Sequence, residues 1–211
     1  MRRRSRRFLR FILLSIFGAF ATAAEARAVG FDCITNTNAG NCAIGEAQLS
    51  VVLSSPGATQ VRFDLANAMG GAASVIAGVY WDDAGLLGSI ASIVNGANTL
   101  FSANGSPPTL PGGNNAVPPF VEDFRVNADA PPPQNGVGPG ETLGVIFNLA
   151  SGVSVAQALA AFDSGALRVG IHVIAFGNNG SESFVNVPEP SAALLMALGV
   201  AALAIGRRFP K

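Results

Sequence analysis

Charged side chains are scarce in this chain, and lysine is the scarcest of them. Of its 211 residues 12% are charged, against about 25% in an average soluble domain, and the formal net charge is zero. Residues 29–187 contain no lysine, and their arginines are Arg62, Arg125 and Arg168. Without a basic face, the chain is not expected to bind nucleic acid. The low charge also argues against a charge-rich disordered chain and against a cytosolic enzyme with an ordinary surface.

The residue patterns that mark common enzymes are missing too. The sequence has no Walker loop, no Gly-x-Gly-x-x-Gly fingerprint, no His-Glu-x-x-His motif and no Gly-x-Ser-x-Gly elbow. The single histidine, His172, is predicted to be exposed or at a rim, on the opposite strand face from its apolar neighbours. Ser181 and Ser183 lie in a Gly/Asn-rich turn, which is not the shaped setting of a serine nucleophile. We therefore predict that the body is not an enzyme and needs no cofactor.

Two pairs of adjacent acidic residues leave glycosidase activity and calcium binding as alternatives. Asp82/Asp83 and Glu122/Asp123 could serve a glycosidase, but neighbours within a strand point to opposite faces, so solvated turn acids are favoured. Oxygen ligands suit calcium, and Asp82 and Asp83, with Asn95, are the candidates. No twelve-residue calcium loop accompanies them.

Aromatic side chains other than phenylalanine are almost absent. Trp81 and Tyr80 are the only tryptophan and tyrosine. Flat rings of this kind can stack on sugars, so Trp81 is a candidate ligand-binding residue. A core tryptophan at a strand end is the favoured alternative.

The chain has two cysteines, Cys33 and Cys42. An even number of cysteines in an exported protein predicts a disulfide. It would fix the turn Ile34–Asn41 before the first strand, and the chain-entropy account gives it roughly 2.5–3 kcal/mol. A metal site is disfavoured, because two thiols and one distant histidine make a poor zinc shell.

Several segments alternate apolar and polar residues, as half-buried β-strands do. In Val61–Leu65 the alternation predicts Arg62 and Asp64 on the wet face. Ser74–Trp81 is apolar on both faces and predicts a central strand, followed by a hairpin turn at Asp82–Gly85. Leu86–Val94 fits a strand or a helix, and its glycines favour a strand. The other alternating rows are Ala47–Leu53, Leu143–Leu149 and Leu167–Ala175.

One helix is expected in the body. Ser154 and Gln157 form a capping box, Val155, Leu159 and Phe162 share one face, and Gly165 fits the C-terminal stop. The predicted fold is mainly β: an antiparallel β-sandwich, jelly-roll-like, with this one short helix. Residues 103–142 are rich in Pro, Gly and Asn and predict a long loop, functional or mobile, with a strand at most over Phe120–Val126.

The charges of the two ends explain the zero net charge. Residues 29–187 hold 11 acidic against three basic residues, while most arginines lie near the termini. Six arginines precede an apolar run of 14 residues, and Ala26-Arg27-Ala28 fits a cleavage site. This layout predicts a signal peptide over residues 1–28, recognised by the secretion machinery and too short for a membrane anchor. Arg6-Arg7 lacks the spacing of a twin-arginine signal, so the general secretory route is expected.

The last residues are the most specific part of the sequence. Pro188-Glu189-Pro190 is followed by an uncharged apolar segment, predicted to form a transmembrane helix over 191–206, and then by Arg207 and Arg208. The arginines are expected to stay cytoplasmic. The prolines end the preceding structure and leave an extended segment outside the bilayer.

This order of Pro-Glu-Pro, apolar helix and arginine cluster resembles the PEP-CTERM sorting signal of Gram-negative bacteria. The resemblance implies that an exosortase, a membrane peptidase, cuts near Pro188–Pro190, so residues 188–211 would be a sorting segment. Phe31-Asp32-Cys33 and Asn41–Gln48 also resemble the opening of an uncharacterised PEP-CTERM exoprotein type.

Together these features divide the chain into a signal peptide (1–28), an extracytoplasmic domain (29–187) and the sorting segment. The protein is expected to be anchored transiently in the inner membrane and then to reach the cell surface or the extracellular polysaccharide matrix. A structural or adhesive role is predicted, with a carbohydrate- or calcium-binding module as the alternative and a glycosidase as a weaker one.

Overall fold

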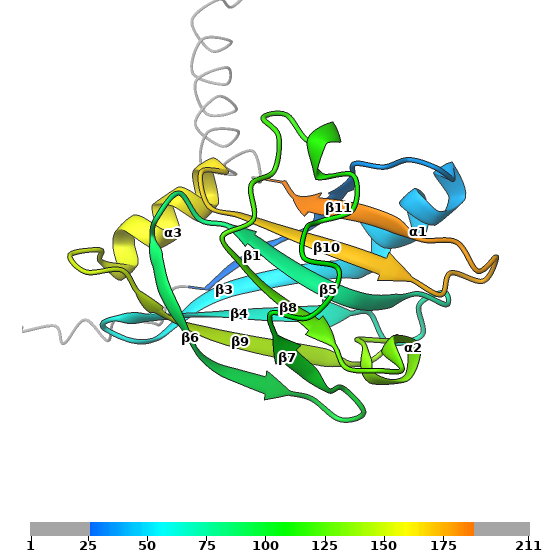
Figure 1. The fold of residues 1–211 in the computed structure, drawn as a ribbon, viewed down its shortest axis with the longest axis horizontal. Coiled ribbons are helices and arrows are strands. Elements are labelled where there is room, and N and C mark those ends of the chain that lie inside the picture. The colour runs from blue at the N-terminus through cyan, green and yellow to red at the C-terminus, as the bar shows by residue number, and fades with distance from the viewer. Residues whose placement is uncertain (1–25, 188–211) are drawn as a thin grey trace, which may run out of the picture.

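Two antiparallel β-sheets face each other across one apolar core in the computed structural model, which describes residues 26–187 (Figure 1). The first sheet has the order β1 (Arg27–Val29), β3 (Leu49–Gly57), β4 (Gln60–Asn67), β9 (Thr142–Leu149), β6 (Leu87–Asn95). The second has the order β2 (Phe31–Cys33), β11 (Glu182–Asn186), β10 (Arg168–Ile174), β5 (Val75–Asp82), β8 (Phe124–Ala128), β7 (Phe101–Ala103). The predicted mainly β class with antiparallel sheets is confirmed; the jelly-roll likeness stays a prediction.

The predicted alternation of apolar and polar residues in β4 is confirmed, and its apolar residues face the core. Val61, Phe63 and Leu65 are fully buried, while the Arg62 and Asp64 side chains pair on the other face of β4 at 2.7 Å. Across the sheets, the Trp81 ring lies edge-on to Phe63 at 5.7 Å and to Phe147 at 4.9 Å. Such edge-to-face aromatic pairs contribute about 0.5–1.5 kcal/mol beyond the area they bury. The aromatic cluster therefore joins the two sheets near the middle of the core.

The turn at Asp82–Gly85 joins the sheets instead of forming a hairpin. β5 belongs to the second sheet and β6 to the first, where β6 pairs with β9. The predicted strand after the turn is confirmed, but the predicted hairpin is wrong. Gly85 has φ +78°, a left-handed conformation that glycine adopts without strain.

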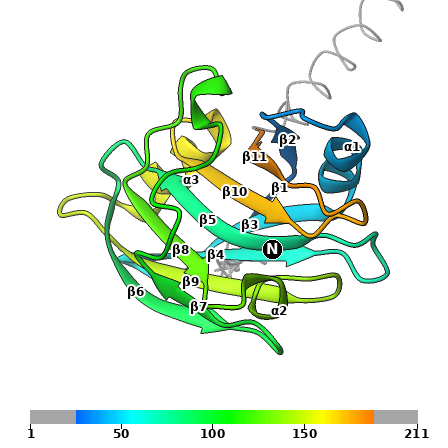
Figure 2. The same cartoon turned by 45° about the vertical axis from the view of Figure 1, so that its right-hand side comes forward.

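The described residues form three α-helices, so the prediction of one short helix is wrong. α3 (Val155–Ser164) has the predicted capping box and ends at Gly165 with φ +75°. α2 (Pro132–Asn135) is a single turn. The unexpected helix is α1 (Ala39–Gln48), which includes Ala47, predicted to begin a strand. Figure 2 shows α1 beside β2 and β11.

The Pro/Gly/Asn-rich region 103–142 contains secondary structure and buried side chains, so it is more than the predicted long loop. It contains the 3-10 turn Gly113–Asn115, β8 and α2, and its predicted strand starts later, at Phe124. Leu110, Ala116 and Phe120 are buried with Tyr80 and Val185 in a second apolar cluster on the outer face of the second sheet. Gly170 permits this close approach, because a Cβ there would lie 2.6 Å from Leu110 Cδ2.

The two predicted targeting segments lie mostly outside the described residues. Residues 1–25 of the signal peptide are not among them, nor is the predicted transmembrane helix 191–206. Of the predicted signal-cleavage residues, Ala26 is exposed and Ala28 lies in β1 opposite Val52. Within residues 26–187, no helix has both the length and the apolar character needed to cross a bilayer.

Candidate functional site at the end of β11

β11 delivers the chain directly to the predicted sorting segment. All five of its residues are buried, and it pairs with β10 on one side and β2 on the other. The next residue, Val187, donates its N–H to the carbonyl of Gly30 at 3.2 Å. Pro188 follows at once, so the described body has no linker before the motif. The predicted sorting residues Pro188, Glu189, Pro190, Arg207 and Arg208 lie outside the described part of the chain.

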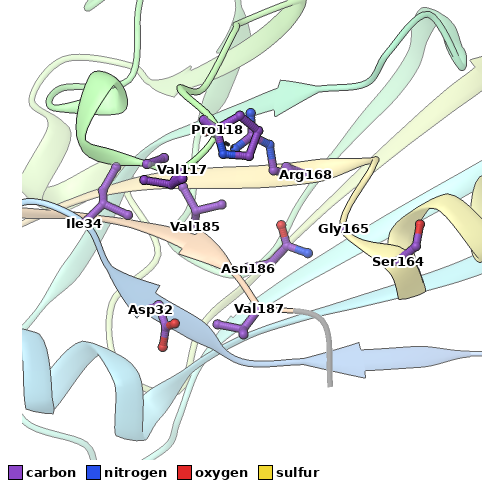
Figure 3. A pocket seen from close by; sticks show the side chains of 11 residues that line it. Asp32, Ile34, Val117, Pro118, Ser164, Gly165, Arg168, Val185, Asn186 and Val187 are labelled. Atoms are coloured by element: carbon purple, nitrogen blue, oxygen red, sulfur yellow. Dashed lines mark hydrogen bonds between the residues drawn. The ribbon is translucent and has the colours of Figure 1, made fainter. Parts of the chain in front are cut away.

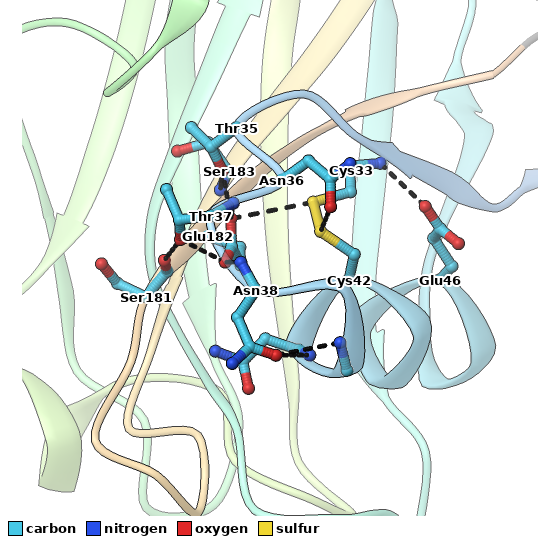
Figure 4. The surroundings of a disulfide bond; sticks show 12 residues. Cys33, Thr35, Asn36, Thr37, Asn38, Cys42, Glu46, Ser181, Glu182 and Ser183 are labelled. Atoms are coloured by element: carbon cyan, nitrogen blue, oxygen red, sulfur yellow. Dashed lines mark hydrogen bonds between the residues drawn. A yellow bond between two sulfur atoms is a disulfide. The ribbon is translucent and has the colours of Figure 1, made fainter.

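The first residue of β11, Glu182, fixes the turn that carries the disulfide (Figure 4). Its side chain is 1% exposed and accepts hydrogen bonds from Thr35 Oγ1 at 2.5 Å, Thr37 N at 3.0 Å and Asn38 N at 2.7 Å, as well as from Thr37 Oγ1. Burial alone would raise the pKa of Glu182, but these donors outweigh it, and its pKa lies below the ordinary value. The turn is therefore held by an ionised carboxylate.

The same turn contains the predicted disulfide. Cys33 and Cys42 are joined with their Cα atoms 5.4 Å apart. Asn38 caps α1 by accepting from the N–H groups of Gly40 and Asn41. Among residues 26–187, the three metal-ligating side chains that lie close together are Cys33, Cys42 and Glu182. The two sulfur atoms are bonded to each other and the carboxylate is surrounded by donors, so this cluster is structural.

A pocket of about 380 Å³ lies where β11 ends (Figure 3). Figure 3 shows Val117 and Pro118 of the loop on one side and Asp32 and Val187 on the other, with Asn186 between them. Asn186 is 4% exposed, and its Oδ1 accepts from the N–H of Val169 at 2.6 Å. Because a backbone N–H can only donate, this bond fixes the amide orientation. Asn186 Nδ2 then has no hydrogen-bond partner among the described residues.

Arg168 lines this pocket and forms an ion pair with Asp82, the first of the two calcium candidates. Its guanidinium pairs with Asp82 and donates to the carbonyls of Pro118 and Pro119 at 2.6 and 2.7 Å. It also lies over the Phe120 ring, 5.2 Å from the centroid. Asp82 additionally accepts from Val121 N at 3.1 Å. The Asp82 carboxylate thus serves to hold the loop against the sheet.

Asp83, the second calcium candidate, is not a solvated turn acid. It is 2% exposed and accepts from Gly85 N at 2.9 Å and Leu87 N at 2.6 Å, which shapes the turn between the sheets. The structure brings it together with Asp123 of the other predicted pair, whose carboxylate accepts from Asp83 N. Burial, and then the contact with Asp123, raises the pKa of Asp83. This acid pair does not line the pocket beside β11.

Trp81 is a core residue, as the favoured interpretation predicted, and the alternative of a sugar-stacking ring is wrong. Trp81 and Tyr80 are both 0% exposed, and a buried ring cannot stack on a carbohydrate. His172 is half-buried, which lowers its pKa, and its Nδ1 lies 3.3 Å from Ser183 Oγ. Ser183 lies in β11, not in the predicted turn, and is fully buried, so its hydroxyl is not open to a substrate.

Comparison with known families identifies the segment that leaves β11. Residues 186–208 match the PEP-CTERM protein-sorting motif, a stretch that starts at the buried Asn186. Neither a curated protein nor a solved structure matches the chain, so the resemblance of the body to an exoprotein type has no support. The chain carries a PEP-CTERM sorting motif, the recognition signal for the membrane peptidase exosortase, and is an exported protein that exosortase processes.

Proposed function

We propose that the protein is a non-catalytic structural or adhesive component of the cell surface or the extracellular polysaccharide matrix. The observation that carries the proposal is the position of the sorting motif, which begins inside β11. Cleavage in or beyond the Pro-Glu-Pro segment would therefore release the described two-sheet body whole.

The use of the ionisable groups supports a structural role. The buried or half-buried charged side chains Glu182, Asp83 and Arg168 bind backbone groups and neighbouring side chains, and each fixes a turn or a loop. Loops that are fixed in this way give the body a rigid surface, which suits a structural or adhesive protein. The acidic, lysine-free composition of residues 29–187 gives this body a net charge of −8, which favours solubility outside the cell.

Cell fractionation with mass spectrometry tests the proposal. Cells that produce the full chain and an exosortase should release a form that lacks the residues after about position 190, and this form should sediment with the polysaccharide matrix. The substitutions Pro188→Ala, Glu189→Ala and Pro190→Ala together should leave the chain in the inner membrane. Pro133→Ala, at an exposed proline of α2, is the control.

Two results would count against the proposal. One is a mature form that stays in the culture fluid without any association with matrix or cells. The other is polysaccharide hydrolysis by the purified wild-type body that Asp123→Asn abolishes, because that would make the acid pair catalytic.

A further inference from the structure

We propose that the pocket at the end of β11 is a docking surface for the exosortase, so that the peptidase contacts the folded body as well as the linear motif. The inference rests on the identification of the sorting motif above. The docking surface is defined by Asp32, Val117, Pro118, Asn186 and Val187.

The first argument is continuity with the recognition signal. The matched motif starts at Asn186, and both Asn186 and Val187 line the pocket. Asn186 is the last residue of a strand paired on both sides, and Val187 is hydrogen-bonded to Gly30. These two residues cannot enter an extended cleft unless β11 leaves the sheet, so a peptidase meets them on the folded surface.

The second argument is the short reach of the chain. Three residues, 188–190, separate Val187 from the apolar segment that begins at Ser191. At full extension the Cα atoms of Val187 and Ser191 are about 14 Å apart at most. In the membrane-anchored precursor, the pocket is therefore held next to the bilayer surface, where a membrane peptidase acts.

The third argument is the unused hydrogen-bonding capacity of the pocket. Asn186 lines the pocket, and its buried Nδ2 finds no acceptor among residues 26–187. A buried donor without a partner costs free energy, which a carbonyl or carboxylate of a bound partner would recover. Beside it, Val117 is 96% exposed and Asp32 is exposed. The fitting partner surface offers an acceptor for Asn186, an apolar group for Val117 and a donor for Asp32.

The test is the rate of C-terminal processing of the full chain in cells that contain the exosortase. Val117→Glu should slow processing about tenfold, as expected for loss of one apolar anchor in an interface. Val117 is almost fully exposed, so the fold should survive, which the Trp81 fluorescence of the purified chain would verify. Met69→Glu, the same change at an 89% exposed side chain outside the pocket, should process at the wild-type rate.

A second variant needs no change in the body. Ten Gly/Ser residues inserted between Val187 and Pro188 separate the pocket from the motif and should also slow processing. Wild-type rates for both Val117→Glu and the insertion, or faster cleavage of the insertion, would overturn the docking surface. Failure of the wild-type chain to be processed would instead contradict the sorting assignment, so the two outcomes are distinguishable.

Discussion

Replacing Glu182 by Ala should be among the most damaging single changes in the body. The substitution leaves the N–H groups of Thr37 and Asn38 and the hydroxyls of Thr35 and Thr37 without their buried acceptor. Hydrogen bonds to a charged group contribute about 1.5–3 kcal/mol each, and these four are not additive. We expect the free energy of unfolding to fall by about 3–5 kcal/mol, because several donors lose their acceptor at about 1–3 kcal/mol each and the losses do not add fully.

Urea unfolding followed by the fluorescence of Trp81, the single buried tryptophan, measures this effect with the disulfide kept intact. Glu46→Gln is the matched control, because Glu46 of α1 is exposed and its carboxylate accepts from Cys33 N, at 3.2 Å. Since the folded pKa of Glu182 lies below the ordinary 4.5, its contribution is complete above that pH and is lost as the pH falls through the folded pKa. Two results would contradict this prediction. One is a difference in unfolding free energy between wild type and Glu182→Ala below about 1 kcal/mol at pH 7; the other is a difference that stays the same at low pH.

Three further predictions concern neighbouring elements. Gly45→Ala should destabilise the fold by about 1–3 kcal/mol, because the new Cβ would lie 2.2 Å from Phe184 Cζ; Gly57→Ala, which meets nothing, is the control in the same urea titration. Reduction of Cys33–Cys42 should lower the unfolding free energy by about 2.7 kcal/mol in urea curves with and without reductant, and an unchanged midpoint would contradict it. The raised pKa of Asp83 means that its ionisation opposes folding, so its contribution to stability should grow as the pH falls through the folded pKa toward the ordinary 3.8; Asp123→Asn should weaken this gain in unfolding curves recorded across pH.

The strands were predictable because their cause is local. Val61, Phe63 and Leu65 face the core by simple alternation, and β10 and β9 follow the same period. The capping box at Ser154 and Gln157 is equally local, since the residues that make it lie within one turn. Such features need no knowledge of the rest of the chain.

α1 was not predicted because tertiary contacts, and not local sequence, stabilise it. Gly40 and Gly45 weaken its helix propensity, and the apolar residues show no helical period. The Asn38 cap was the one local signal. The disulfide from Cys42 to Cys33 and the packing of Gly45 on Phe184 supply the rest. Phe184 belongs to β11, which lies about 140 residues further along the sequence.

The residues of the candidate docking surface show the same division. Val117 belongs to no motif, and Glu182, the first residue of β11, follows a Gly/Asn-rich turn with no pattern that marks it as a buried acceptor. Their roles arise only when β2, β11 and the loop meet at one end of the second sheet. Likewise, Asp83 and Asp123 come from two pairs judged separately in the sequence, and the β5–β6 turn joins them.

The sequence by itself determined that the protein is exported and processed by exosortase, because a sorting signal is a linear order of Pro-Glu-Pro, apolar segment and arginines. It also determined the regularly alternating strands β4, β9 and β10, which follow from the alternation, and the disulfide pairing, which follows from there being two cysteines. Only the tertiary structure decided which acids are buried, that α1 forms, and that the sorting motif starts inside a paired strand. Those facts depend on contacts between distant segments, which local patterns do not encode.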